Sequence, residues 1–589
     1  MNKGDFIPFS FWKRHEKSGK LLMIMISYIQ YRYGVNQMNL NQEIANAVFP
    51  SVTRNLTDLE RIYPARSLPV NAMVTRFAPS PTGFLHTGSL FASLCSWRYA
   101  KQSGGVFFCR LEDTDTKREI SGSGNQVLVE LAKYGIIPDE DFVSGGAYGP
   151  YVQSERKFIY DVVIKDMLEN DLAYPCFCTH EDLDAMRRKQ EILKVNPGYY
   201  GEYAVCRLIP KEQVLAKIKN GDSFVIRFKS PGNQTHKILI TDLIRGSFEM
   251  TENDQDIVIM KGDGLPTYHF AHLVDDHFMR STVVTRGEEW MASLPIHLQL
   301  FDAMGWNRPK YAHLPVIMKL DEGTRRKLSK RKDPEAAVSF FLEAGYPIEG
   351  FLEYLMTIAN TNFEAWRLQN PEANIFDFRL SFDKMTLDGA LFDLEKVKSI
   401  SKDRLALFST GTITEKALEW AKLYQPDFAS VIESDISYFH AIMAIERGGE
   451  KPRKDYAKYS DIFPIIDFMY DQYYDQYMKG ELPFNPNLAK TVIINVLNTY
   501  NAEPSLDLGE SEWFEKLKSM ATECGFSPSV KEYKKNKEAF YGHIGDFAEI
   551  IRISVSGKKN TPNFYYILKI LGIEKISKRI NKTIALLKE

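Results

Sequence analysis

The chain has 589 residues, of which 44% are hydrophobic and 25% are charged. This ordinary globular composition excludes intrinsic disorder and collagen-like or mucin-like architectures, and the length favours several domains. The 74 basic and 76 acidic side chains give a net charge of −2, which excludes a wholesale polycation but not a local basic patch.

Residues 1–37 differ from the rest of the chain, since they are rich in Met, Tyr and basic residues and show no periodicity. The apolar stretch 21–29 follows basic residues, but no signal-peptide cleavage site comes after it. We interpret 1–37 as an extension, either a targeting segment or, in the interpretation we favour, a start codon assigned too early. No apolar run reaches the ~18 residues that a membrane span needs. We expect a cytoplasmic protein without a membrane partner.

The next part of the chain reads as an α/β unit. Residues 38–72 suggest a short helix and a lead-in, and from Met73 the pattern becomes strand, loop, helix and strand. The strands are expected over 73–78 and 106–111, and the helix begins at Gly88, with apolar residues one turn apart. A βαβ unit of this kind predicts a parallel sheet.

Between about 172 and 265 the pattern turns to short strands, and an Asp-Gly hairpin signal lies in 261–264. A second strand and helix follow over 281–304. An α/β domain is therefore predicted to be split by an inserted β-rich domain.

Beyond about residue 400 the sequence predicts almost only helices. Its last 59 residues hold 13 Lys and Arg against 6 Asp and Glu, an excess hidden in the net charge of the whole chain. Lys558, Lys559 and Lys578 lie in this basic end. An excess of positive charge can bind the phosphates of a nucleic acid, and a solvated helical face is the alternative.

Two segments carry candidate chemistry. Residues 76–89 join the first strand to the first helix, where a parallel sheet binds ligands and a helix N-terminus attracts phosphate. Gly83 and Gly88 would allow close approach, and His86 could donate hydrogen bonds. Residues 327–332 (KLSKRK) could neutralise a leaving pyrophosphate. Taken singly, the first could be a plain turn and the second a solvated charge run.

Together, these segments resemble class I aminoacyl-tRNA synthetases, and within them the bacterial-type glutamyl-tRNA synthetases. The resemblance is carried by 76–83 (RFAPSPTG) with 86–89 (HTGS), and by 327–331 (KLSKR). Between them, 110–115 (RLEDTD) and 266–269 (PTYH) also match. The agreement runs from about Met38 to the C-terminus.

The resemblance implies a Rossmann-type nucleotide-binding domain split by an inserted β-rich acceptor-binding domain, followed by an all-helical anticodon-binding region. The expected parts are the extension 1–37, a lead-in 38–72, catalytic halves 73–170 and 266–306, the insertion 171–265, a stem-contact region with the KLSKR loop 307–400, and the anticodon-binding region 401–589.

The resemblance also implies a two-step ligation of L-glutamate to tRNA(Glu), in which ATP and glutamate form glutamyl-adenylate and Mg²⁺ bridges phosphate oxygens. His86 and Lys330 would hold the phosphates, assisted by Lys327, while Gly88 leaves room for adenine. The expected ATP-binding residues are Pro79, Ser80, His86, Gly88, Ser89, Lys327, Leu328, Ser329, Lys330 and Arg331. A monomer is implied, and charging of tRNA(Gln) is left open.

For glutamate, the resemblance implies that Arg76 and Tyr268 hold the side-chain carboxylate and that Glu112 holds the ammonium group. Many relatives carry Asn where this chain has His272, whose imidazole would then contact the α-carboxylate. The expected glutamate-binding residues are Arg76, Ala78, Ser80, Glu112, Tyr268, His272 and Arg286.

Three cysteines, Cys176, Cys178 and Cys206, lie within the expected insertion. Related enzymes can bind zinc there, and Tyr200 is the candidate fourth ligand. Three thiolates and one further donor would meet the tetrahedral requirement of Zn²⁺. Three reduced structural cysteines are the alternative.

The sequence disfavours three other functions. A dinucleotide-dependent oxidoreductase would need G-x-G-x-x-G after the first strand, which is absent. A truncated synthetase that glutamylates a tRNA base would lack the helical C-terminal half. A non-catalytic RNA-binding descendant is disfavoured by His86, Glu112 and Lys330.

Overall fold

The computed structural model describes residues 39–81, 83–115, 123–329, 331–387, 389–450 and 452–589. The extension 1–37 and Lys330 therefore lie outside the described residues. The chain forms two compact units: the first comprises the described residues up to 332 with 358–366 and 376–391, and the second comprises 333–357, 367–375 and 392–589. In the described ranges, no helix is long and apolar enough to cross a membrane.

The predicted βαβ unit is present in the first compact unit. Strand β1 (Val74–Phe77) pairs in parallel with β2 (Val106–Cys109), and α4 (Thr87–Gln102) connects them. The core of this unit includes the fully buried side chains of Leu90, Leu94 and Phe108. The loop between β1 and α4 therefore lies at the carboxyl end of a buried strand.

The second strand–helix pair lies beside β1. The backbone N–H of Thr282 donates to Val74 O over 2.9 Å, so β8 (Val283–Gly287) runs next to β1. Strand β8 pairs in parallel with β9 (Lys310–Leu314). The predicted helix begins as a 3-10 turn (Glu288–Ser293) and becomes α10 (Leu294–Ala303) at Pro295, which fits only the first turn of a helix.

The segment expected to form the insertion contributes to two sheets. Strands β3 (Ala173–Cys176), β4 (Val225–Phe228) and β7 (Val258–Met260) form an antiparallel sheet of their own. The hairpin of β5 (Lys237–Asp242) and β6 (Gly246–Thr251) instead joins β9 of the catalytic sheet, with Asp242 opposite Tyr311. This pairing brings Asp242 under the candidate site.

The other elements of the first unit complete its core and the basic loop. Buried side chains of α6 and α9 pack together with those of the strands. These elements are helix 39–48, α3 (Leu56–Ile62), α5 (Ser123–Lys133), α6 (Lys157–Glu169), α7 (His180–Ile192), α8 (Lys211–Lys219), α9 (Tyr268–Phe278), β10 (Ile317–Asp321), β11 (Thr324–Lys327) and β12 (Ala390–Leu391). Helix α13 (Phe363–Gln369) continues into residues of the second unit.

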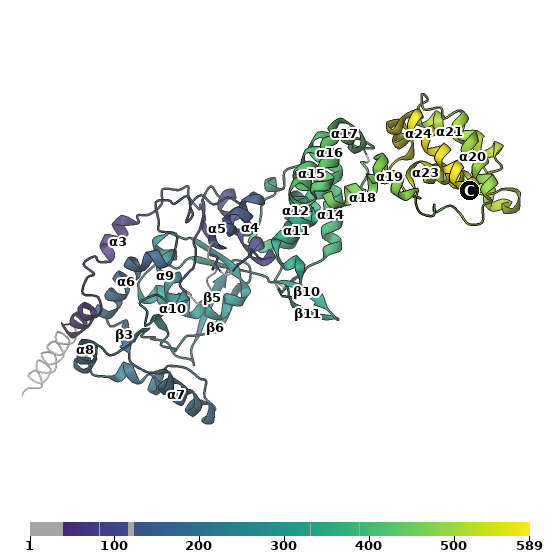
Figure 1. The fold of residues 1–589 in the computed structure, drawn as a ribbon. Helices are drawn as coiled ribbons and strands as arrows, with labels where there is room; N and C mark the ends of the chain where they lie inside the picture. The colour runs from purple at the N-terminus through teal and green to yellow at the C-terminus, as the bar shows by residue number, and fades with distance from the viewer. Residues whose placement is uncertain (1–38, 82, 116–122, 330, 388, 451) are drawn as a thin grey trace, which may run out of the picture. The chain divides into compact units, whose positions relative to one another are not determined.

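The second unit is helical, as predicted, and its long helices are drawn from green to yellow in Figure 1. Its core includes the fully buried Phe547, Ile551 and Leu568. The helices are α11 (Val338–Ala344), α12 (Ile348–Ala359, which ends in residues of the first unit), α14 (Leu394–Leu407), α15 (Thr410–Tyr424), α16 (Pro426–Ser434), α17 (Ile436–Met443), α18 (Ile462–Ile466), α19 (Asp471–Tyr477), α20 (Lys490–Ala502), α21 (Glu510–Glu523), α22 (Val530–Lys535), α23 (Ile544–Ser556) and α24 (Phe564–Lys588).

Candidate active site

A cavity of about 480 Å³ opens at the carboxyl ends of β1, β8 and β9. Parallel α/β sheets bind ligands at this edge, because the strand ends and the helix N-termini converge there. Most of the residues expected to bind ATP and glutamate line this cavity: Arg76, Ala78, Pro79, Ser80, His86, Gly88, Ser89, Glu112, Tyr268, Arg286 and Lys327. The structure thus brings together side chains that are up to 251 residues apart in the sequence.

His86 caps the N-terminus of α4. Its Nδ1 accepts the backbone N–H of Gly88 at 3.0 Å. In a neutral ring the proton must then reside on Nε2, which can donate to an anion. A Cβ at position 88 would lie 3.3 Å from His86 Nδ1, so Gly88 lets the ring approach this closely. Cap and cavity together suit a phosphate group.

Arg76 belongs to a buried network of charges. Its Nε lies 3.2 Å from Asp276 Oδ2, and Asp276 also accepts from Arg110 at 3.0 Å. Arg110 in turn contacts Glu112 at 3.1 Å. Burial alone would raise the pKa of Asp276, but the charges of Arg76 and Arg110 and the hydrogen bond with His272 hold it well below its usual range. Asp276 therefore remains an anion that fixes Arg76 at the cavity wall.

Glu112 has the opposite pKa shift. Burial raises the pKa of its carboxyl group, although Arg110 and Arg76 oppose the shift. Its side chain is 10% exposed and lines the cavity. A carboxylate held there by Arg110 can bind an ammonium group.

Tyr268 and Arg286 close the cavity from α9 and β8. The ring of Tyr268 packs against that of Trp290 in a tilted arrangement, with centroids 4.4 Å apart. Arg286 is 6% exposed, and its Nη2 donates to Trp290 O at 3.3 Å. The two side chains thus hold the same tryptophan and face the same space.

His272 does not line the cavity, which corrects its expected contact with the α-carboxylate. The ring is fully buried: Nε2 lies 3.0 Å from the Tyr311 hydroxyl and Nδ1 lies 2.8 Å from Asp276. One helical turn after Tyr268, the side chain of residue 272 points into the core rather than towards the ligand space. Its imidazole serves the network beneath the site.

The basic loop enters the cavity through Lys327 at the end of β11. Its Nζ forms an ion pair with Glu289 Oε1 at 2.8 Å, and the side chain is half exposed. Leu328 is buried, Arg331 is exposed, and neither they nor Ser329 are part of the cavity lining. Lys330 is outside the described residues, so its predicted phosphate contact stays a prediction.

Glu289 and Trp290 were missed from the sequence, although both line the cavity. They follow Arg286 directly, in the run RGEEW at 286–290. A strand that ends at the ligand edge of a parallel sheet is a signal that could have found them.

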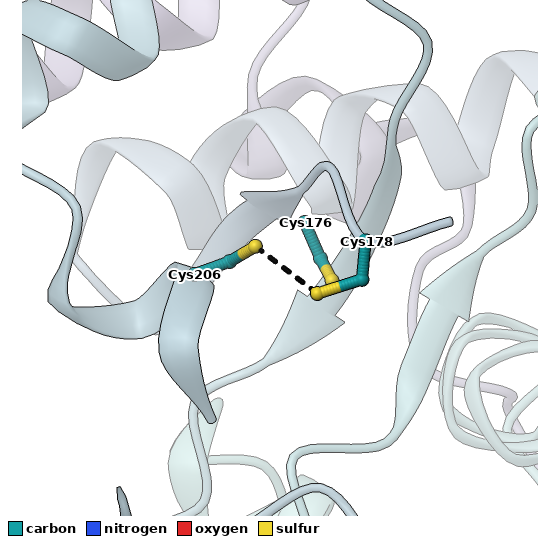
Figure 2. A group of neighbouring side chains, drawn as sticks. All are labelled: Cys176, Cys178 and Cys206. Carbon is teal, nitrogen blue, oxygen red and sulfur yellow. Dashed lines mark hydrogen bonds between the residues drawn. The ribbon is translucent and has the colours of Figure 1, made fainter. Parts of the chain in front are cut away.

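The three cysteines form one cluster, whose ligand atoms all lie within 4.8 Å of one another (Figure 2). The sulfurs of Cys178 and Cys206 are 3.5 Å apart. The nearby hydroxyl is that of Tyr199, at 3.3 Å from Cys178 Sγ and 3.5 Å from Cys176 Sγ. Tyr200, the candidate fourth ligand, instead donates to Asn196 O at 2.7 Å, so its hydroxyl does not face the cysteines.

Two family models match this chain. The model of the catalytic domain of class I tRNA synthetases (E and Q) matches residues 72–376. The chain belongs to this family. A model of an anticodon binding domain matches residues 453–584. The expected class of synthetase and its two-part organisation are confirmed.

Among relatives of this class I synthetase is the glutamate–tRNA ligase of Clostridium perfringens (strain SM101), 42% identical over 92% of this chain and 100% of its own length. That of Acetivibrio thermocellus is 43% identical over 92% of this chain and 99% of its own. This chain is also similar to a crystal structure of a glutamate tRNA ligase from Elizabethkingia meningosepticum in complex with its amino acid, with a TM-score of 0.70 and 29% sequence identity. The match covers 88% of this chain and 100% of that one. The resemblance to glutamyl-tRNA synthetases is thereby confirmed.

Proposed function

We propose that this synthetase ligates L-glutamate to tRNA(Glu) in two steps. An oxygen of the glutamate α-carboxylate attacks the α-phosphorus of ATP, pyrophosphate leaves, and glutamyl-adenylate remains. A hydroxyl of the terminal adenosine of the tRNA then takes the glutamyl group and AMP leaves. One observation carries the proposal: a single cavity contains a capped helix N-terminus for phosphate and two buried arginines for carboxylates. The relatives named as glutamate–tRNA ligases support the choice of amino acid.

On the phosphate side, the N-terminus of α4 and His86 Nε2 would stabilise charge on ATP. Lys327 would exchange Glu289 for a phosphate oxygen, as a flexible point charge can. Lys330 would join it from the same loop, and a bound Mg²⁺ would supply further positive charge against the phosphates. Pro79, Ser80, Gly88 and Ser89 would shape the nucleotide pocket, with Leu328, Ser329 and Arg331 supporting the loop.

On the amino-acid side, Arg76, Arg286 and Tyr268 would bind glutamate carboxylate groups, and Glu112 would bind the ammonium group. Ala78 and Ser80 would complete the wall. With the substrates held in one geometry, catalysis needs no covalent attachment to a side chain, because positioning and charge stabilisation lower the barrier.

Glutamate-dependent exchange of pyrophosphate into ATP tests the first step, and charging of separate tRNA(Glu) and tRNA(Gln) transcripts tests the second. The exchange should require glutamate, and at least tRNA(Glu) should be charged. Lys330→Ala should lower adenylate formation by at least about a hundredfold, the scale of losing one preorganised donor. Wild-type protein without glutamate-dependent exchange would refute the proposal.

We further propose that Cys176, Cys178 and Cys206 hold Zn²⁺. A tetrahedral zinc with Zn–S bonds of about 2.3 Å places its sulfurs about 3.8 Å apart, which agrees with a cluster confined within 4.8 Å. The sulfurs of Cys178 and Cys206 are 3.5 Å apart, so the three thiols are already close enough to share one ion. Tyr199 or a water would complete the coordination.

Metal analysis of the purified protein tests the zinc site. About one zinc per chain is expected, and Cys206→Ser should lose most of it. Cys524→Ser is the matched control, because Cys524 is also buried but lies in the second unit. Wild-type protein without zinc would favour three reduced structural cysteines.

A further inference from the structure

Arg286 is surrounded by neutral acceptors. Its Nε lies 3.0 Å from His313 Nε2 and its Nη1 lies 3.1 Å from His297 Nδ1. Its third contact is a backbone carbonyl, that of Trp290. In the part of the chain that the structure describes, no carboxylate lies within ion-pair distance of Arg286, whereas Arg76 has Asp276. A guanidinium stays protonated in proteins, so with neutral partners its positive charge remains uncompensated and available to an anionic ligand.

The contacts around His313 assign its tautomer. Nδ1 lies 2.7 Å from Asp242 Oδ2, and a carboxylate can only accept, so Nδ1 carries the proton. Nε2 is then the lone-pair nitrogen that accepts from Arg286. Asp242 is itself fixed by the backbone N–H groups of Ile244 at 2.9 Å and Arg245 at 3.0 Å. Burial alone would raise the pKa of Asp242, but these bonds and His313 hold it below its usual range.

His297 has the opposite tautomer. Since its Nδ1 accepts from Arg286, the proton of its neutral ring is on Nε2, which lies 3.0 Å from His269 Nδ1. Burial lowers the pKa of both His297 and His313, and the charge of Arg286 acts in the same direction. Both rings therefore stay neutral acceptors.

We propose that His313 and His297 are positioning residues that hold Arg286 without neutralising it, and that Asp242 sets the tautomer of His313. The inference rests on the proposed function, in which Arg286 binds a glutamate carboxylate. A carboxylate in place of either imidazole would hold the guanidinium equally well but would cancel the charge that attracts the substrate. The two histidines thus orient the guanidinium of Arg286 while leaving its positive charge available to the substrate.

Paired substitutions test this assignment through steady-state ATP–pyrophosphate exchange, with glutamate and ATP varied separately. His313→Leu should raise KM for glutamate at least about tenfold, the scale of a hydrogen bond to a charged group, and leave KM for ATP within about twofold. His313→Gln should recover most of the loss, because its Oε1 can accept from Arg286. The corresponding pair at the other ring is His297→Leu and His297→Asn, in which Oδ1 replaces Nδ1.

Asp242→Asn tests the tautomer. The amide can donate to His313 Nδ1, which would place the imidazole proton on Nε2. Two donors, His313 Nε2–H and Arg286 N–H, would then oppose each other. KM for glutamate should therefore rise as in His313→Leu. His236→Leu, at an exposed imidazole, is the control. Thermal unfolding midpoints identify variants that fail to fold. If the Leu variants do not fold, the milder variants His313→Gln, His297→Asn and Asp242→Asn still give a result.

The outcomes separate the two claims. Wild-type protein without glutamate-dependent exchange overturns the proposed function and this inference with it. If Arg286→Leu abolishes glutamate binding while folded His313→Leu and Asp242→Asn keep the normal KM, only the inference is overturned. Equal losses in His313→Leu and His313→Gln would also overturn it, since a position that merely fills space does not respond to a restored acceptor.

Discussion

The two arginines of the cavity differ in what surrounds them. Arg76 is held by the anion Asp276 and Arg286 by two neutral imidazoles. Glutamate and glutamine have nearly the same shape, so an apolar pocket would separate them poorly. A guanidinium pairs two N–H donors with a carboxylate and finds no such partner in an amide.

Arg76→Gln is therefore expected to lower kcat/KM for glutamate by at least about a hundredfold, because a charged bidentate contact is lost. Binding of ATP should change little. Exchange rates measured against glutamate concentration give the result, with Arg76→Lys as a variant that keeps the charge but not the fork. If Arg76→Gln keeps the affinity and rate for glutamate, the distinction between glutamate and glutamine must instead depend on Arg286.

The burial of His272 should make the stability of the protein depend on pH. Burial lowers the pKa of this imidazole to about 4, although Asp276 opposes the shift. An unfolded chain has a histidine pKa of about 6.5, so below that pH the unfolded state binds more protons. The stability contributed by the neutral ring is complete above about pH 6.5 and is lost as the pH falls towards 4.

His272→Asn should consequently reduce the difference in unfolding free energy between pH 7.5 and pH 5 by about 2 kcal/mol. Denaturant unfolding of both proteins at the two pH values measures it. The same substitution at the exposed His236 controls for loss of an imidazole. An unchanged difference would mean that His272 is not the group that takes up the proton.

At the scale of elements, the lysines of α22 and the lysine that follows α23 differ in what they contact. Lys534 and Lys535 of α22 are exposed. Lys558, after α23, is instead only 19% exposed, and its Nζ lies 2.6 Å from Asp467 and 2.5 Å from Pro464 O. A lysine engaged in this way holds the unit together, so Lys558 is a poorer candidate for a tRNA contact than its charge suggested.

Reversing both charges of α22, with Lys534→Glu and Lys535→Glu, should weaken tRNA binding and reduce the slope of log affinity against log salt by about 1.5, because fewer counterions are released. Lys558→Ala should lower the thermal midpoint and leave that slope nearly unchanged. Lys422→Glu on α15 is a control for charge reversal elsewhere. Equal slopes in the α22 double mutant and the wild type would exclude α22 from the interface.

For the whole molecule, N-terminal truncations test which part of the chain is needed for folding and activity. Residues 1–37 supply no periodic apolar face, so a variant that begins at Met38 should fold and charge tRNA as well as the full chain. A variant that begins at Met73 should not, because it loses Ala45, Leu59 and Tyr63, which are buried in the core of the first unit. Soluble yield and charging rate measure both. An inactive Met38 variant would place 1–37 within the working protein.

Local patterns were sufficient for the elements and the motifs. Strands β1 and β2, helix α4 and the helical second unit were predicted because apolar periodicity is a property of neighbouring residues. The RFAPSPTG and KLSKR segments likewise indicated the family before any contact was known.

Only the tertiary structure showed which residues far apart in the sequence are in contact and to which side individual side chains point. The β5–β6 hairpin joins β9, and Asp242 thereby meets His313, across 71 positions. Tyr199 rather than Tyr200 faces the cysteines, because adjacent residues of an extended segment point to opposite sides. His272 lies on the same face of α9 as Tyr268, one turn further on, but its ring is buried against Tyr311 and Asp276, partners that the motif did not specify. Sequence periodicity determines which face is buried, whereas long-range packing determines which partner each buried group meets.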